Sequence, residues 1–290
     1  PPGDSLRINL TNTLPDPNPV SVVIPGQAMP LDGVNPGPQV TRNQDGRIRS
    51  FTHETPNGQT AAYLWPAIKP GTYLYQSGTH QAVQVQMGLY GAVKNDAAPG
   101  EAYPGKSYVN EITYLFSEID PLLHAAVAAG SYGGPLYPST INYVPKYFLI
   151  NGQPYSDPPP PPTYVPTHQT LLIRFLNSGL QTHVPVILGM DMELVAEDGN
   201  LYPYPKTQYS VPLFAGKTTD ALMTPSRVDT YPVFDRALGL TNGTAGAGGM
   251  LTYVATGDVV TFTTQPVSQT VRVGTPVSFS AAITGTGPFG

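Results

Sequence analysis

The sequence predicts an all-β protein built as a sandwich or barrel. Short apolar or alternating runs recur along most of the chain and are bounded by Asn, Pro and Gly. The 34 Pro and 30 Gly residues are spread without a Gly-X-Y period, which excludes collagen and indicates many turns. Strands at this spacing favour a sandwich or barrel over a βαβ fold.

The first series of strands occupies the N-terminal third of the chain. Turn sequences separate the runs, among them Pro25-Gly26, Asp32-Gly33 and Pro70-Gly71. The expected strands are Leu6–Leu10, Val20–Ile24, Ala61–Trp65, Thr72–Tyr75 and Ala82–Tyr90.

One helix is expected, at Ser117–Ala129. Asp120-Pro121 is typical of a helix start, and the Ala-rich stretch that follows ends at Gly130.

A second series of strands surrounds and follows this helix. Its members are Glu111–Phe116, Tyr147–Ile150, Thr170–Phe175, Val184–Leu188, Met192–Ala196, Asp220–Met223 and Met250–Val254. The insert Ser156–Pro166 holds five consecutive prolines, Pro158 to Pro162, and is expected to be an exposed polyproline II loop or spacer, with a docking ligand as the alternative.

The last segment, from Thr263 to Gly290, differs in character from the rest. Its Thr-, Ser- and Val-rich sequence predicts two alternating strands joined by a turn at Gly274-Thr275-Pro276. Because the chain begins at Pro1 without a signal peptide and stops after a new strand pattern has begun, we expect a segment of a longer polypeptide.

Charge and hydropathy exclude two classes of partner. The net charge is -5 and no cluster of Lys and Arg occurs, which argues against nucleic acid. No apolar run approaches the roughly 20 residues that a membrane-spanning helix requires.

The absence of cysteine excludes several kinds of site. With Cys at zero there is no disulfide framework and no iron–sulfur cluster. A blue-copper centre of the ordinary kind is also excluded, because it needs a Cys thiolate beside two His.

Three stretches resemble the multicopper oxidase superfamily. The first runs from Gly71-Thr-Tyr-Leu-Tyr-Gln-Ser-Gly-Thr-His80 to Gln84-Val-Gln-Met-Gly-Leu-Tyr-Gly91, the second joins Phe148–Gly152 with Leu172–Asn177, and the third joins Glu193–Gly199 with Ala215–Leu222. The resemblance covers most of residues 5–255 in the family's order. The tail is similar to the start of a bacterial immunoglobulin-like (Ig-like) repeat.

The resemblance implies two cupredoxin-like Greek-key domains of the β-sandwich or barrel kind, at residues 1–98 and 99–258. The Pro-rich insert 156–166 falls within the second domain, and an incomplete Ig-like segment follows at residues 259–290.

The segments that resemble the family's copper motifs depart from the pattern. The family's trinuclear copper cluster uses four His-x-His pairs. The first pair should precede Asp32-Gly33, where Gly26–Pro30 contains no His. In the second pair, Gln76 and Gly78 stand at the positions of the first His, and His80 is at most the surviving member. Five His in the whole chain cannot supply eight ligands, so we expect no multicopper oxidase activity.

His53 and His80 are the candidate metal ligands. Neutral imidazole suits copper or zinc, and Glu54 could add a ligand or hold an imidazole in place. Against this, the two histidines are not at a local ligand spacing, and a lone His on a β surface usually makes a structural hydrogen bond. Of the other histidines, we expect His183 to serve packing, and His124 and His168 to face solvent.

Two hypotheses of function remain. In the first, the chain is a structural or assembly module on a degenerate oxidase scaffold, part of a surface protein or filament, which needs no cofactor and associates with itself or with other surface proteins. In the second, it is a copper-binding or redox protein with one copper at His53 and His80, or with ligands shared with a missing domain or a neighbouring subunit. Both predict an extracellular or cell-surface location, with the periplasm as the alternative.

Overall fold

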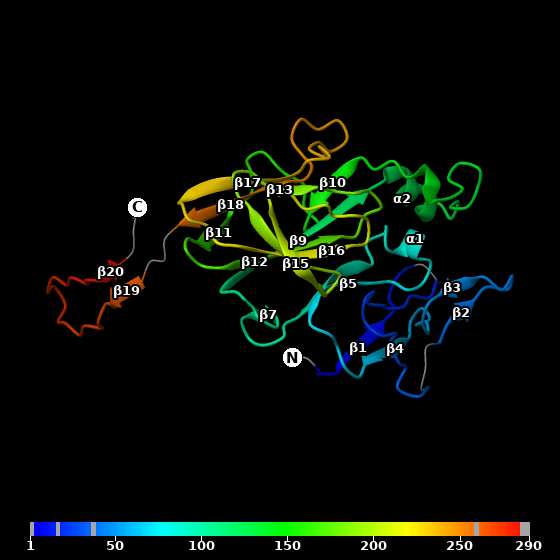
Figure 1. Cartoon of the computed structure of the whole chain (residues 1–290), viewed down its shortest axis with the longest axis horizontal. Coiled ribbons are helices and arrows are strands. Elements are labelled where there is room, and N and C mark those ends of the chain that lie inside the picture. The colour runs from blue at the N-terminus through cyan, green and yellow to red at the C-terminus, as the bar shows by residue number, and fades with distance from the viewer. Residues whose placement is uncertain (1–2, 16–17, 36–38, 258–260, 285–290) are drawn as a thin grey trace.

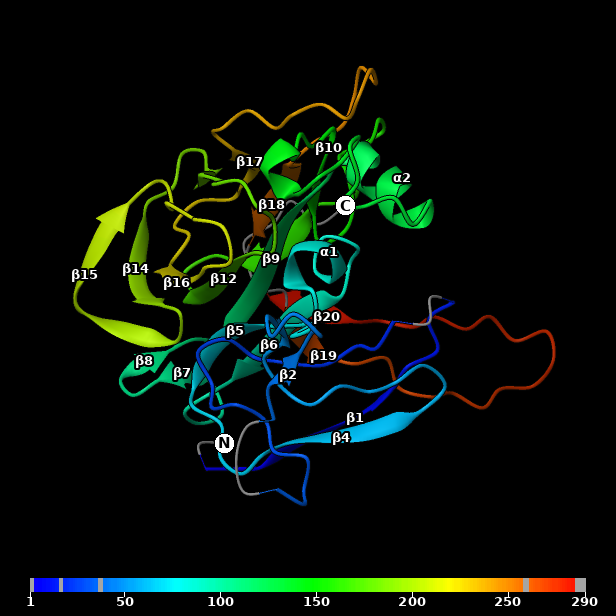
Figure 2. The same cartoon turned by 90° about the vertical axis from the view of Figure 1, so that its right-hand side faces the viewer.

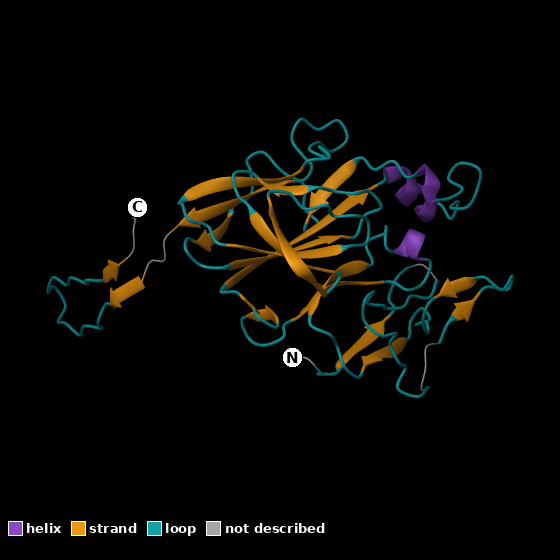
Figure 3. Cartoon of the chain, viewed as in Figure 1, coloured by secondary structure: helices purple, strands orange, loops and turns teal. Residues whose placement is uncertain are grey.

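The computed structural model describes residues 3–15, 18–35, 39–257 and 261–284. Strands account for most of the regular structure, and the helices gather at one end of the molecule (Figure 3). The predicted all-β class is therefore confirmed. Among the described residues, no helix is long and apolar enough to cross a bilayer.

Small antiparallel pairs make up the N-terminal region, which we define as the described residues up to 98 (Figure 1). In β1 the side chains of Leu6, Ile8 and Leu10 are half-buried and alternate with exposed Arg7 and Asn9, as expected for a strand with one face on a core. The pairs are β1 (Leu6–Thr11) with β4 (Thr60–Trp65), β2 (Thr41–Arg42) with β3 (Ile48–Ser50), and β5 (Gly71–Gln76) with β6 (Tyr90–Asn95).

Two of the strands predicted in this region are not present in the structure. Val20–Ile24 is buried but joins its neighbours only through single bridges, from Val20 to Thr55 and from Val23 to Gln76. The other, Ala82–Tyr90, contains the short helix α1 (Gln81–Gln84) and a turn before β6 begins. Its alternating apolar residues suggested a strand.

Two sheets face each other in the central region, residues 99–257 (Figure 1). Ile112 and Phe175 from one sheet and Val233 and Val254 from the other meet in one buried cluster, so the region is a β-sandwich. The larger sheet has the order β10 (Tyr147–Ile150), β9 (Asn110–Ile119), β12 (Leu171–Asn177), β16 (Thr218–Met223), β14 (Met192–Glu197) and β15 (Asn200–Gln208). The smaller sheet has the order β11 (Thr163–Pro166), β18 (Leu251–Gly257), β17 (Asp229–Asp235) and β13 (Pro185–Ile187).

The expected helix is present but shorter. Helix α2 spans Pro121–Ala128, and Asp120 caps it by accepting a hydrogen bond at Oδ1 from the Leu122 amide at 2.9 Å. Ser117 to Ile119 continue strand β9 instead, because their backbone pairs with β10. A one-turn 3-10 helix, η1 (Thr140–Asn142), follows on the same side.

The Pro-rich insert divides into two parts. Residues 158–162 are exposed, as predicted. Thr163–Pro166, expected to continue the loop, instead forms β11 and pairs parallel with β18, with Val165 buried in the core.

Four further strands of the central region were not expected from the sequence. β17 pairs with β18 and β13 in the smaller sheet, and β7 (Glu101–Tyr103) pairs with the short β8 (Lys106–Ser107). β15 lies at the edge of the larger sheet and contacts β14 in two paired stretches, with Pro203 and Pro205 in the interval between them.

The tail extends away from the sandwich (Figures 1 and 2). β19 (Thr261–Thr264) pairs with β20 (Ala282–Thr284), and the predicted turn at Gly274 is present, with a hydrogen bond from the Thr275 amide to the Arg272 carbonyl at 3.1 Å. The prediction of two strands directly beside that turn is wrong, because residues 265–281 form no β-ladder. The expected Ig-like segment, 259–290, is described here only over 261–284, and its kinship with Ig-like repeats stays a prediction.

Candidate functional site

The segment that resembles the second copper pair follows strand β5. Gln76 ends the strand and exchanges two backbone hydrogen bonds with Val23, at 2.8 and 2.9 Å. Two residues later, Gly78 is buried against neighbouring side chains. A Cβ at this position would lie 2.8 Å from Val23 Cγ1 and 2.9 Å from Ser21 Oγ. Where the resemblance implies an imidazole, the space is filled by other side chains.

A chain of hydroxyl groups occupies the same place. Ser21 Oγ contacts Ser50 Oγ at 3.1 Å and Thr79 Oγ1 at 2.9 Å, and all three residues are buried. Thr79 Oγ1 donates in turn to Glu54 Oε1 at 3.1 Å. Arg49 completes the array with two hydrogen bonds to the Glu54 carboxylate. We call Ser21, Ser50 and Thr79 the hydroxyl chain.

Helix α1 is held against this segment by side-chain hydrogen bonds. Ser77 Oγ donates to Gln84 Oε1 at 2.6 Å, and Gln84 Nε2 donates to the Pro19 carbonyl at 2.9 Å. The Gln84 amide also bonds to the carbonyl of His80, which lies in the left-handed region at φ 41°. These contacts replace the strand expected at Ala82–Tyr90.

His53 is held by two hydrogen bonds. Nε2 lies 2.8 Å from the Ala62 carbonyl, so this nitrogen carries the proton, and Nδ1 lies 3.2 Å from Thr52 Oγ1. The ring is half-buried and stacks on Tyr63 with centroids 4.1 Å apart. The one nitrogen with a free lone pair in neutral His53 is therefore already used by a hydroxyl.

His80 does not share a pocket with His53. Its side chain is exposed and lines a shallow hollow of about 170 Å³ together with Phe51 and Tyr132, whereas His53 lines a different pocket. Within the described part of the chain, no three His, Asp or Glu side chains are grouped so that they could hold a metal ion. The residues present here do not fit the copper cluster that the resemblance implies.

Packing around Gly78 leads to a stability prediction. We expect Gly78→Ala to lower the free energy of unfolding by about 1–3 kcal/mol, because the new methyl group overfills the space beside Val23 and Ser21. Urea denaturation would measure the change. Gly246→Ala is the matched control, since Gly246 has open space around its Cβ position. Equal stability of the two variants would contradict the packing described here.

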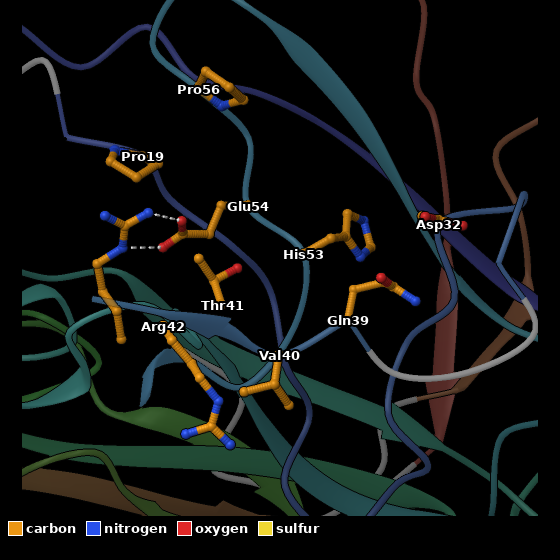
Figure 4. A pocket seen from close by; sticks show the side chains of 10 residues that line it. Pro19, Asp32, Gln39, Val40, Thr41, Arg42, His53, Glu54 and Pro56 are labelled. Atoms are coloured by element: carbon orange, nitrogen blue, oxygen red, sulfur yellow. Dashed lines mark hydrogen bonds and ion pairs between the residues drawn. The ribbon is translucent and has the colours of Figure 1, made fainter. Parts of the chain in front are cut away.

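A pocket of about 620 Å³ opens beside His53 (Figure 4). We call it the hairpin pocket because the β2–β3 hairpin forms one wall. In the view of Figure 4, Gln39 lies next to His53, and Asp32 lies on the far side of His53 from Glu54. Its lining residues are Pro19, Asp32, Gln39, Val40, Thr41, Arg42, Arg49, His53, Glu54 and Pro56.

Asp32 in this pocket is fixed as a carboxylate. Its Oδ1 accepts hydrogen bonds from the amides of Asn35 and Val34, both at 2.7 Å. These backbone hydrogen bonds lower the pKa of Asp32 to about 2. A fixed negative charge therefore lies on one side of the pocket.

A charged triad lies buried in the central region. His183 Nδ1 is 2.8 Å from Asp235 and Nε2 is 3.1 Å from Glu118, and the two Glu118 oxygens also accept the amides of Leu180 and Gln181. Burial alone would lower the pKa of His183, but the hydrogen bonds to Asp235 and Glu118 outweigh it and raise the pKa to about 9. His183 was expected to serve packing, and it does so as an imidazolium between two carboxylates.

A second buried network joins the N-terminal and central regions. Arg174 is fully buried and donates to Asp96 at 2.5 Å, to Glu111 at 3.2 Å and to Thr72 Oγ1 at 2.9 Å. The Thr72 hydroxyl donates onward to Asp220 at 2.6 Å. Strand β5 is thereby tied to β9, β12 and β16. The sequence offered no sign of either network beyond single charged residues within strand-like runs.

The remaining histidines have no shared site. His168 is exposed, as predicted. The expectation that His124 faces solvent is wrong: it is half-buried, and its Nε2 contacts the Gln86 carbonyl at 3.1 Å.

Comparison with known proteins agrees with this fold. The multicopper oxidase family pattern matches residues 125–256. None of the curated protein sequences matches the chain.

Several solved structures share the architecture over most of the chain. A blue copper oxidase from Nitrosomonas europaea superposes with a TM-score of 0.67 at 19% identity, covering 88% of this chain and 74% of that one. Copper nitrite reductase from the same organism superposes with a TM-score of 0.62 at 16% identity, covering 88% of this chain and 80% of that one. Fet3p, a multicopper oxidase that functions in iron import, superposes with a TM-score of 0.59 at 18% identity, covering 97% of this chain and 50% of that one. At these identities the likeness shows the fold, and the predicted cupredoxin-like class is confirmed.

Proposed function

The chain carries a multicopper oxidase domain at residues 125–256 and has the cupredoxin-like fold of that superfamily, and from this premise we propose that it is a rigid structural module without oxidase activity. In this proposal the copper motifs have been replaced by packing. Its two cupredoxin-like domains are residues 1–98 and 99–258, followed by an Ig-like segment at 259–290.

The observation that carries the proposal is the filled space at Gly78. Val23 and Ser21 lie within 3 Å of the position that a Cβ would take. Because the hydroxyl chain beside it already satisfies its own hydrogen bonds, an imidazole and a copper ion could enter only by displacing buried groups. In this proposal, the side chains of Val23 and of the hydroxyl chain stabilise the fold and leave no set of copper ligands.

Rigidity across the two regions supports a mechanical role. The buried Arg174 links the two regions through charge-assisted hydrogen bonds to Thr72, which is buried, and to Asp96, which is half-buried. Such a junction resists relative movement of the two domains more than a wet interface would. A stiff spacer or building block suits this property.

The proposed setting is extracellular or at the cell surface, with the periplasm as the alternative. The proposed partner is another copy of the chain or another surface protein. A low fraction of charged residues, 11%, and 18 Tyr support contact with other proteins, because Tyr is enriched at interfaces and charged residues are depleted there.

Copper binding at His53 and His80 is the competing proposal. The exposed imidazole of His80 favours it, since its side chain has no hydrogen-bond partner among the described residues. The hydrogen bonds that hold His53 oppose it.

Elemental analysis of the protein from its native source would decide between the two. We expect copper well below stoichiometric amounts in the protein and in the His53→Ala, His80→Ala variant, and a thermal midpoint that a chelator does not change. Near-stoichiometric copper that disappears in the variant would instead establish the metal site and reject the structural proposal.

A further inference from the structure

The hairpin pocket has the size and construction of a small-molecule site. Its volume of about 620 Å³ lies within the range of about 300–1,000 Å³ that ligand pockets span. Separate loops and the β2–β3 hairpin supply its walls, so residues distant in sequence converge on one space.

The charges around the pocket balance. Arg49 and Glu54 neutralise each other through two hydrogen bonds. The other charged side chains of the lining are Asp32 and Arg42, which have opposite signs. An anionic ligand would meet the Asp32 carboxylate, and a cationic ligand would meet the Arg42 guanidinium. The balance therefore favours an uncharged ligand.

Donors and acceptors remain available in fixed positions. Arg42 uses one N–H group on the Gly46 carbonyl at 2.9 Å, out of the five that a guanidinium carries. Asp32 is oriented by the amides of Val34 and Asn35, and the roughly four acceptor positions of a carboxylate exceed the three hydrogen bonds it accepts there. A pre-oriented donor and acceptor lower the entropic cost of binding.

Hydroxyl groups complement such a pocket best, because each one both donates and accepts. Pro19, Val40 and Pro56 add apolar surface to the lining, which suits the C–H faces of a sugar ring. The geometry points to the hairpin pocket as a binding site for a neutral saccharide unit of a glycan. This inference goes beyond the structural role and does not depend on the copper question.

Isothermal titration of the full chain tests the inference. The probes are neutral trisaccharides of glucose, xylose, mannose and N-acetylglucosamine, with a galacturonate trimer and a glucosamine trimer as charged counterparts. At least one neutral probe is expected to bind with a Kd of about 1 mM or below, and the charged probes more weakly. Pull-down on the matching insoluble polysaccharide then distinguishes a polymer ligand from a free sugar.

Matched variants locate the binding. Arg42→Ala and Asp32→Asn are each expected to raise the Kd about tenfold, a change that the loss of one good hydrogen bond can produce. Arg47→Ala is the control, since Arg47 is an exposed residue of the same hairpin and does not line the pocket. An unchanged thermal midpoint shows that each variant folds. Binding of charged probes alone, binding of no probe at about 10 mM, or equal Kd values in all variants would overturn the inference.

Discussion

Replacing His183 with Gln is expected to lower the free energy of unfolding by about 3–5 kcal/mol, the range measured when one partner of a buried ion pair is removed. Glu118 and Asp235 would remain buried without their shared cation. Guanidinium denaturation followed by circular dichroism would measure the loss. His168→Gln is the matched control, because His168 is exposed, and it is expected to change stability by less than about 0.5 kcal/mol.

The effect of His183 depends on pH in a defined direction. Its pKa is raised to about 9 from the ordinary 6.5, so protonated His183 contributes stability that is fully present below pH 6.5 and is lost as the pH rises through 9. The difference between the native chain and His183→Gln should therefore shrink between these pH values. A constant difference across that range would show that His183 acts through packing alone.

Arg174→Met is expected to destabilise the chain by a similar amount, about 3–5 kcal/mol, because the buried Asp220 and the half-buried Asp96 lose the nearby buried cation. The loss should also loosen the junction between the two regions. Limited proteolysis near residue 98 would then be faster, alongside the shift in denaturation midpoint.

A combined variant separates charge from packing at this junction. Arg174→Met with Asp96→Asn removes one of the uncompensated charges and should recover part of the lost stability, while Glu111 keeps its ion pair with Lys94. Arg7→Met on the exposed face of β1 is the control and should be nearly neutral. If the combined variant is less stable than Arg174→Met alone, the network acts through hydrogen bonds other than those between opposite charges.

Features encoded by neighbouring residues could be predicted from the sequence. The start of α2 follows from Asp120-Pro121, because the cap and the first-turn proline act within a few residues. β4 and β5 follow from apolar and aromatic runs between turns. The family resemblance added the kind of sandwich, which no local pattern specifies.

Features that depend on distant residues could not be predicted. The run Ala82–Tyr90 alternates like a strand, yet hydrogen bonds from Gln84 to Ser77 and Pro19 favour a helical turn there. Strand β15 was not predicted, because Pro203 and Pro205 are residues that rarely occur within strands.

The candidate site shows the same division. Sequence comparison with the family identified Gln76 and Gly78 as departures from the copper motif. It did not show that Ser21 and Val23 fill the space, because contacts across more than fifty residues leave no local signal. His53 was found by residue type, but its hydrogen bonds to Thr52 and Ala62 come from the fold.

The prolines of β15 also limit how copies of this sandwich can join. An edge strand with free N–H groups is a template on which a foreign strand can add and propagate a fibre. Pro203 and Pro205 have no amide N–H to donate, and both lie in the interval where β15 is not paired with β14. Continuous strand-by-strand growth is thus blocked along this side. An ordered polymer of the chain would then grow through side-chain contacts or through another sheet edge, such as β10 in the same sheet or β11 and β13 in the smaller sheet.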